Sequence, residues 1–139
     1  MLPRRNRKRA QRENKLPDRL SEIFKLREEF MHRINQKIDG AYPEWPVDLS
    51  KKKNQQAIRE FAFRGMEELF EALLHLKNWK NHREETYGVP EFDKEEFLEE
   101  MIDAFNYFLA IIVLAGVDQE EFFAAYVRKH GIITDRLDA

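Results

Sequence analysis

Two acidic pairs at helical spacing are the residues of this sequence best suited to chemistry. Glu68 and Glu71 form the first pair, and Glu100 and Asp103 form the second. Carboxylates three positions apart project from the same face of a helix, about 5–6 Å from each other. Two such helices packed face to face would bring four carboxylates into a small volume. Oxygen ligands of this kind are those that Mg²⁺ prefers.

The sequence around both pairs predicts helices that pack against a core. Apolar residues recur at helical spacing beside Glu68 and Glu71 and also cover much of the opposite side of that helix. A helix that is apolar almost all round is usually buried. Because carboxylates beside a core are costly unless a cation or donors compensate them, we predict that all four are metal ligands. The alternative is that they are solvated or paired with basic neighbours such as Arg64 or Lys77.

Length and composition favour a single domain. The chain has 139 residues and 11 Phe, enough for one core. It contains no apolar run long enough for a membrane span, and its basic start lacks the apolar segment of a secretory signal. The absence of cysteine excludes disulfides and thiolate zinc sites. We expect a cytoplasmic protein, in the host cytoplasm if the protein is viral.

Charge divides the chain into a basic start and an acidic remainder. Residues 1–19 hold eight basic and two acidic side chains, whereas the whole chain has a net charge of −2. We expect residues 1–17 to form a disordered, solubilising arm. An alternative is that the basic residues from Arg4 to Arg12 bind nucleic acid. The protein would then be a non-catalytic helical interaction or nucleic-acid-binding module.

Residues 18–139 are expected to form one all-α domain, because no alternating strand pattern appears. Four helices are expected: from Asp18 or Ser21 to Asp39, from after Asp48 or Ser50 to about Asn81, from Asp93 to the stop at Gly116, and from Asp118 to Gly131. Both Asp93 with Glu96 and Asp118 with Glu121 are similar to capping boxes. Within the second helix, Gly65 marks either a weak spot or a point of close packing.

The predicted architecture is a four-helix bundle. The short connection between the third and fourth helices favours antiparallel neighbours. Apolar residues left over from the core suggest that homodimerisation completes the bundle. In the proline-rich connection 40–49, Tyr42 and Trp45 either cover a pocket or seal the core.

The two acidic pairs resemble the signature of the all-α nucleoside triphosphate pyrophosphohydrolases, the superfamily of the MazG-type enzymes and the dimeric dUTPases. That signature matches Glu67-Glu68-x-x-Glu71 followed by Glu100-x-x-Asp103. Further similarity to the dimeric dUTPase and phage dCTPase branch lies in residues 23–27, 76–80 and 116–129. The resemblance spans roughly residues 20–136, and the acidic pairs are its most specific part.

This resemblance implies a homodimeric enzyme that needs Mg²⁺, with Mn²⁺ as a substitute. Its expected reaction is attack of water on the α-phosphorus of a nucleoside triphosphate, which yields the monophosphate and pyrophosphate. Glu71 or Glu68 would orient or deprotonate the water, and Glu67 would assist from outside the ligand set. The expected substrate is dUTP, or else dCTP or another pyrimidine nucleotide.

Basic and aromatic residues are candidates for substrate contacts. Lys129 and Arg136 stand seven apart, a spacing similar to that of the phosphate-binding Lys and Arg of dimeric dUTPases. Lys77 and Lys80 beside Trp79 resemble another element of that branch. The alternatives are surface positions for the cations and core packing for Trp79.

The base-recognition half of the expected site departs from the branch pattern. The branch commonly has Gln where Arg27 stands, His where Asn106 stands, and Asn at the positions of His130 and Ile133. An arginine cannot replace the paired donor and acceptor of an amide. These departures indicate dCTP, a modified pyrimidine or a permissive pocket. A family member that binds a nucleotide without hydrolysing it is a third interpretation.

Overall fold

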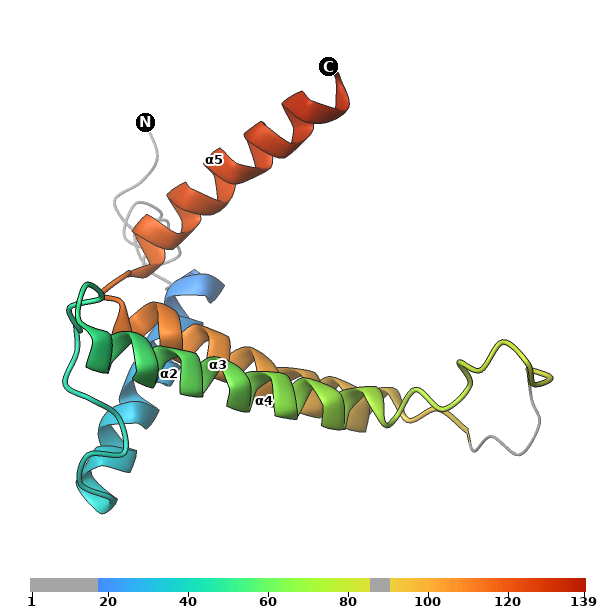
Figure 1. The fold of residues 1–139 in the computed structure, drawn as a ribbon, viewed down its shortest axis with the longest axis horizontal. Helices are drawn as coiled ribbons and strands as arrows, with labels where there is room; N and C mark the ends of the chain where they lie inside the picture. The colour runs from blue at the N-terminus through green and yellow to red at the C-terminus, as the bar shows by residue number, and fades with distance from the viewer. Residues whose placement is uncertain (1–17, 86–90) are drawn as a thin grey trace, which may run out of the picture.

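The computed structural model describes residues 18–85 and 91–139 (Figure 1). The predicted arm of residues 1–17 lies outside this range. Four helices make up the described part, which contains no strand: α2 (Arg19–Lys37), α3 (Lys52–Leu73), α4 (Lys94–Leu114) and α5 (Gln119–Leu137). The prediction of an all-α protein with four helices is confirmed.

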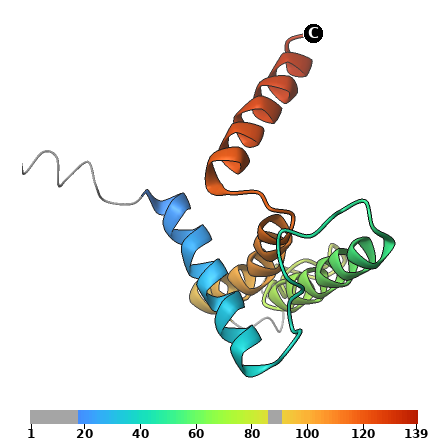
Figure 2. The same ribbon diagram turned by 90° about the vertical axis from the view of Figure 1, so that its left-hand side faces the viewer.

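The centre of the molecule is an antiparallel pair, α3 and α4, with α2 packed across it (Figures 1 and 2). Each of the three helices contributes apolar side chains to one buried cluster. Its members are Phe24 and Met31 from α2, Phe61 from α3, and Leu109, Ala110, Val113 and Leu114 from α4. The cluster fixes how α3 lies along α4, and therefore which of their polar residues meet.

Gly65 is a point of close packing between α3 and α4. A Cβ atom at this position would lie 3.0 Å from the Cβ of Tyr107, closer than such atoms normally approach. Because the Tyr107 Cβ is attached directly to the backbone of α4, even an alanine at residue 65 would require the two helices to separate slightly. Glu68 follows one turn later on α3 and is brought near α4 by this contact.

Aspartates begin three of the helices, as the sequence predicts. The side chains of Asp18, Asp93 and Asp118 each accept a hydrogen bond from the backbone N–H three residues later, at 2.7, 3.0 and 2.9 Å. A cap of this kind typically stabilises a helix by about 1 kcal/mol. The starts of α2, α4 and α5 are therefore determined locally.

Two helix ends differ from the prediction. The helix expected to continue to Asn81 ends at Leu73, where backbone bonds to the residue three earlier tighten the last turn. The following residues lie largely in solvent and gain no packing that would extend the helix. The helix expected to stop at Gly131 continues to Leu137. A single helical glycine costs only about 1 kcal/mol, too little to end α5.

Helix α5 leaves the other three helices (Figure 1) and has no buried residue. Its axis turns 107° from that of α4, so the predicted antiparallel packing of these two helices is wrong. The turn is set by Gly116, whose φ of 79° favours glycine and whose absent Cβ would lie 2.7 Å from Pro46. The Val47 N–H also donates to the Leu114 carbonyl at 2.8 Å. The connection after α2 thus covers the end of α4 and redirects the chain.

No single helix in the described ranges is long and apolar enough to cross a membrane.

Candidate metal centre

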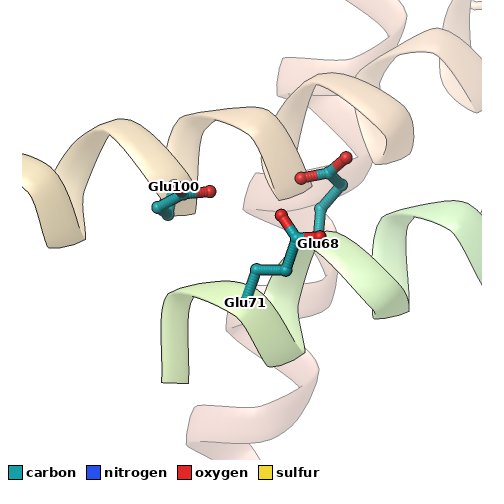
Figure 3. A group of neighbouring side chains, drawn as sticks. All are labelled: Glu68, Glu71 and Glu100. Atoms are coloured by element: carbon teal, nitrogen blue, oxygen red, sulfur yellow. The ribbon is translucent and has the colours of Figure 1, made fainter. Parts of the chain in front are cut away.

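Three carboxylates converge between α3 and α4. Glu68 and Glu71 project from α3 toward Glu100 on α4 (Figure 3). One oxygen from each of these side chains lies within 4.8 Å of the others. The three-residue spacing on α3 places its pair on one face, and the antiparallel packing supplies the third group. Three carboxylate oxygens suit a hard divalent cation such as Mg²⁺ or Mn²⁺.

Asp103 lies one turn beyond Glu100 on α4. It lines the same cavity as Glu68 but is not among the three oxygens that meet within 4.8 Å. Its side chain is one carbon shorter than that of glutamate and is exposed. The structure therefore brings the four predicted ligands to one region and places three of them in direct proximity.

The electrostatics of the cluster are evident at Glu68. Burial raises the pKa of the Glu68 carboxyl, and the neighbouring carboxyls of Glu71, Asp103 and Glu100 raise this pKa further. Each of these charges makes the ionised form of Glu68 less favourable. A cation at the cluster would reverse this effect, because it attracts the same carboxylates that repel one another.

A cavity of about 690 Å³ adjoins Glu68 and Asp103 and opens to solvent. Its walls are largely apolar and aromatic, and come mainly from α2 and α4: Ile23, Leu26, Phe30, Tyr42, Ile102, Phe105 and Tyr107. Tyr42 also stacks on the core residue Phe61, with ring centroids 5.2 Å apart. The two remaining polar lining residues are Arg27 and Asn106. The volume lies within the range of about 300–1,000 Å³ typical of small-molecule sites.

A known protein family matches most of this chain. The model of the phosphoribosyl-ATP pyrophosphohydrolase family matches residues 24–130, which include both acidic pairs. The chain belongs to this family. No curated protein and no solved structure matches the chain. A member of this pyrophosphohydrolase family acts on a nucleotide-like substrate, which agrees with a carboxylate cluster beside a cavity of this size.

The phosphoribosyl-ATP pyrophosphohydrolase family belongs to the same all-α, MazG-like group of enzymes that the sequence resembles. The coarser part of that resemblance is therefore confirmed. The match does not extend to the dUTPase and dCTPase branch, so specificity for dUTP is not established.

Two of the predicted substrate-binding residues, Arg27 and Asn106, are lining residues of the cavity. Both line the cavity next to Glu68 and Asp103. The Arg27 guanidinium lies over the ring of Phe30, 4.3 Å from its centroid. Burial lowers the pKa of Arg27, an effect that the nearby hydroxyls of Tyr42 and Tyr107 oppose.

The other predicted substrate contacts do not line this cavity. Lys77, Trp79 and Lys80 lie in the exposed stretch after α3. Trp79 is 69% exposed, so core packing of its ring within this chain is wrong. Lys129 and Arg136 are exposed on α5. Their roles in binding phosphate stay predictions.

Glu67 is exposed and does not belong to the three-carboxylate group. Assistance by Glu67 in catalysis also stays a prediction.

Ile23, Leu26 and Phe30 were not among the predicted site residues, and in the structure they form one wall of the cavity. These residues are 41%, 55% and 47% exposed. Their spacing of three to four along α2 was the signal in the sequence, because it marks an apolar stripe shared with Arg27. Periodicity alone does not distinguish a stripe that meets a core from one that faces a cavity.

Proposed function

We propose that this protein is an Mg²⁺-dependent nucleoside triphosphate pyrophosphohydrolase, with Mn²⁺ as a substitute ion. The observation that carries the proposal is the group of three carboxylates beside a cavity of nucleotide size. Glu68, Glu71 and Glu100 would hold the ion, with Asp103 as a fourth ligand. Bound Mg²⁺ supplies positive charge for the triphosphate and lowers the pKa of a bound water.

The proposed reaction is attack of water on the α-phosphorus. The bond from this phosphorus to the oxygen that bridges to the β-phosphorus breaks, so pyrophosphate leaves and the nucleoside monophosphate remains. Glu71 is the proposed base because its exposed carboxylate is open to water beside the cluster. Glu68 is the second candidate, since it also contributes an oxygen to the cluster. Glu67 faces solvent and would act only indirectly.

The substrate expectation has two forms. The sequence resemblance favours dUTP first and dCTP second. The match to the phosphoribosyl-ATP pyrophosphohydrolase family over residues 24–130 adds phosphoribosyl-ATP as a third candidate. All of these substrates would present their triphosphate to the carboxylates. They differ in the base, and in any group attached to it, that would enter the cavity.

The test is pyrophosphate release, measured by phosphorus NMR or a coupled assay. The common dNTPs and NTPs, dUTP and phosphoribosyl-ATP would each be supplied with Mg²⁺, and then with EDTA. We expect monophosphate and pyrophosphate from a narrow set of substrates, and no turnover in EDTA. If nucleotides bind without turnover in Mg²⁺ or Mn²⁺, the protein is a binding member of the family and the catalytic proposal fails. If no nucleotide binds while DNA or RNA binding depends on salt and on residues 1–17, the nucleic-acid alternative replaces it.

We also propose that the protein is a homodimer. Helix α5 buries none of its residues, yet it carries exposed apolar side chains, among them Phe123, Tyr126, Val127 and Leu137. Monomeric proteins rarely expose contiguous apolar patches of more than a few hundred Å². Because Lys129 and Arg136 do not line the cavity of their own chain, their proposed contact with phosphate requires movement of α5 or its delivery by a second copy.

Light scattering after size exclusion tests the dimer. We expect twice the chain mass of 16.8 kDa. Tyr126→Asp should shift the mass toward that of one chain, because a charge would enter the apolar face. Arg128→Asp is the matched control, since residue 128 lies on nearly the opposite side of the helix. A wild-type mass of one chain at micromolar concentration would contradict the proposal.

A further inference from the structure

Arg27 is the one cation among the described residues that line the cavity. It projects from α2 into a space whose other walls are largely apolar or aromatic. The carboxylates of Glu68 and Asp103 line the same cavity. If the triphosphate lies at the carboxylates, as the proposed function requires, the apolar part that contains Arg27 receives the nucleobase.

The Arg27 side chain has a donor that the described residues do not satisfy. Its Nε atom is buried and has no hydrogen-bond partner among them. No described carboxylate forms a salt bridge with its guanidinium. A buried donor without a partner costs free energy. Because this atom is closed to solvent, a ligand in the cavity would meet the terminal nitrogens of the Arg27 guanidinium.

An arginine side chain donates at every nitrogen and accepts at none. A group that pairs with it through two hydrogen bonds must therefore present two adjacent acceptors. Cytosine does so with O2 and N3, and guanine does so with O6 and N7. Uracil and thymine carry an N–H at N3, between their two carbonyl groups, and adenine places an amino group beside N7. In each of these bases a donor would face the donors of Arg27.

Asn106 does not alter this selection. Its amide offers both an acceptor and a donor, and it can turn either group toward a base. The bias of the cavity therefore comes from Arg27.

We propose that Arg27 determines base specificity and selects a nucleotide whose base has two adjacent acceptors, cytosine or guanine, over uracil, thymine and adenine. This inference rests on the proposed function, because it assumes that the triphosphate lies at the carboxylates. It places dCTP or dGTP ahead of two candidates named above, dUTP and the adenine nucleotide phosphoribosyl-ATP.

The experiment compares kcat/KM for dCTP, dGTP, dUTP and dATP in Mg²⁺. We expect wild-type protein to prefer dCTP or dGTP by roughly 10- to 100-fold, the discrimination that a bidentate contact provides. Whichever of the two is preferred identifies the base. Arg27→Gln should reduce the preference, because an amide can also pair with uracil or adenine. Arg33→Gln makes the same change at an exposed residue of α2 and should keep the wild-type ratio.

Arg27→Lys separates base recognition from phosphate binding. Lysine keeps the positive charge but lacks the two parallel donors. A role in phosphate binding would largely survive this change, whereas base selection would be lost. A uniform loss of kcat/KM for all four nucleotides in Arg27→Gln, with an unchanged ratio, would assign Arg27 to phosphate and overturn the inference. Equal wild-type kcat/KM values for dCTP, dGTP and dUTP would also overturn it.

Equilibrium binding keeps this test independent of turnover. The probes are dCTP, dGTP and dUTP analogues with an imido group between the α- and β-phosphates, titrated in Mg²⁺. A preference for the cytosine or guanine analogue, lost in Arg27→Gln, supports base selection even if no substrate is hydrolysed. In that case the catalytic proposal alone fails. Binding without preference overturns the role of Arg27 and leaves the catalytic proposal intact.

Discussion

Glu71→Gln is expected to lower kcat for the preferred nucleotide by about 10²–10⁴-fold, the contribution typical of a general base. The substitution keeps the size of the side chain but removes its negative charge. It therefore weakens metal binding and also removes the proposed proton acceptor. Glu71 is exposed and outside the buried core, so the variant should fold. Pyrophosphate release at saturating Mg²⁺ and nucleotide measures the effect.

Two further variants test whether the effect follows the geometry of the cluster. Asp103→Asn should have a smaller effect than Glu71→Gln, because Asp103 is not among the three oxygens that meet within 4.8 Å. Glu99→Gln removes an exposed carboxylate beside Glu100 and should leave kcat unchanged. Wild-type kcat in Glu71→Gln would contradict the proposed role of the cluster. Equal losses in Glu71→Gln and Glu99→Gln would indicate a general effect of charge.

The carboxylate cluster could be predicted from sequence because its determinants are local. Residues three apart share a helix face whatever the rest of the chain does. The apolar pattern around Glu68 and Glu100 then indicated which faces meet. Gly65 added a signal of its own, since a glycine inside a long apolar helix is compatible with close approach of a second helix. The aspartate caps that begin α4 and α5 were predictable for the same local reason.

The position of α5 could not be predicted because it depends on contacts between distant residues. A short connection after α4 is compatible with several directions for the next helix. The direction observed depends on Pro46 beside Gly116 and on the hydrogen bond from Val47 to Leu114. Pro46 and Val47 belong to the connection after α2, nearly seventy residues earlier in the chain than the end of α4. The spacing of apolar residues along the sequence carries no information about contacts between residues so far apart.

The apolar surface was overassigned to the core for a related reason. The second predicted helix is apolar almost all round, which usually indicates burial. In the structure Phe63 and Phe70 of α3 are 55% and 60% exposed. Among the described residues α3 packs chiefly against α4, and much of the rest of its apolar surface is exposed.

Glu68→Gln is expected to change thermal stability in opposite directions with and without metal. In the metal-free folded protein the pKa of Glu68 lies above its ordinary value of 4.5. At pH values between the ordinary pKa of Glu68 and its raised pKa in the folded protein, the folded state binds more protons than the unfolded state. The free energy of unfolding therefore falls as pH rises. At neutral pH the ionised Glu68 is therefore destabilising. The neutral amide introduced by Glu68→Gln avoids this repulsion and should raise Tm in EDTA at pH 7.

At pH values below 4.5 the advantage of Glu68→Gln should disappear, because a protonated glutamate and a glutamine are both neutral. Saturating Mg²⁺ should reverse the order at pH 7. An ion at about 100 times its Kd stabilises the folded state by about 2.7 kcal/mol. The variant loses much of this stabilisation, because it lacks one of the carboxylates that would coordinate the ion.

Thermal melts in EDTA and in Mg²⁺ at both pH values measure the four conditions, with Glu99→Gln as the matched control. A lower Tm for Glu68→Gln in EDTA at pH 7, or an equal rise in Tm with Mg²⁺ in the variant and the wild type, would show that the carboxylates are not held together for a cation. The reversal would show instead that the cluster reduces the stability of the metal-free fold and restores it on binding, as expected of a site shaped for its ion.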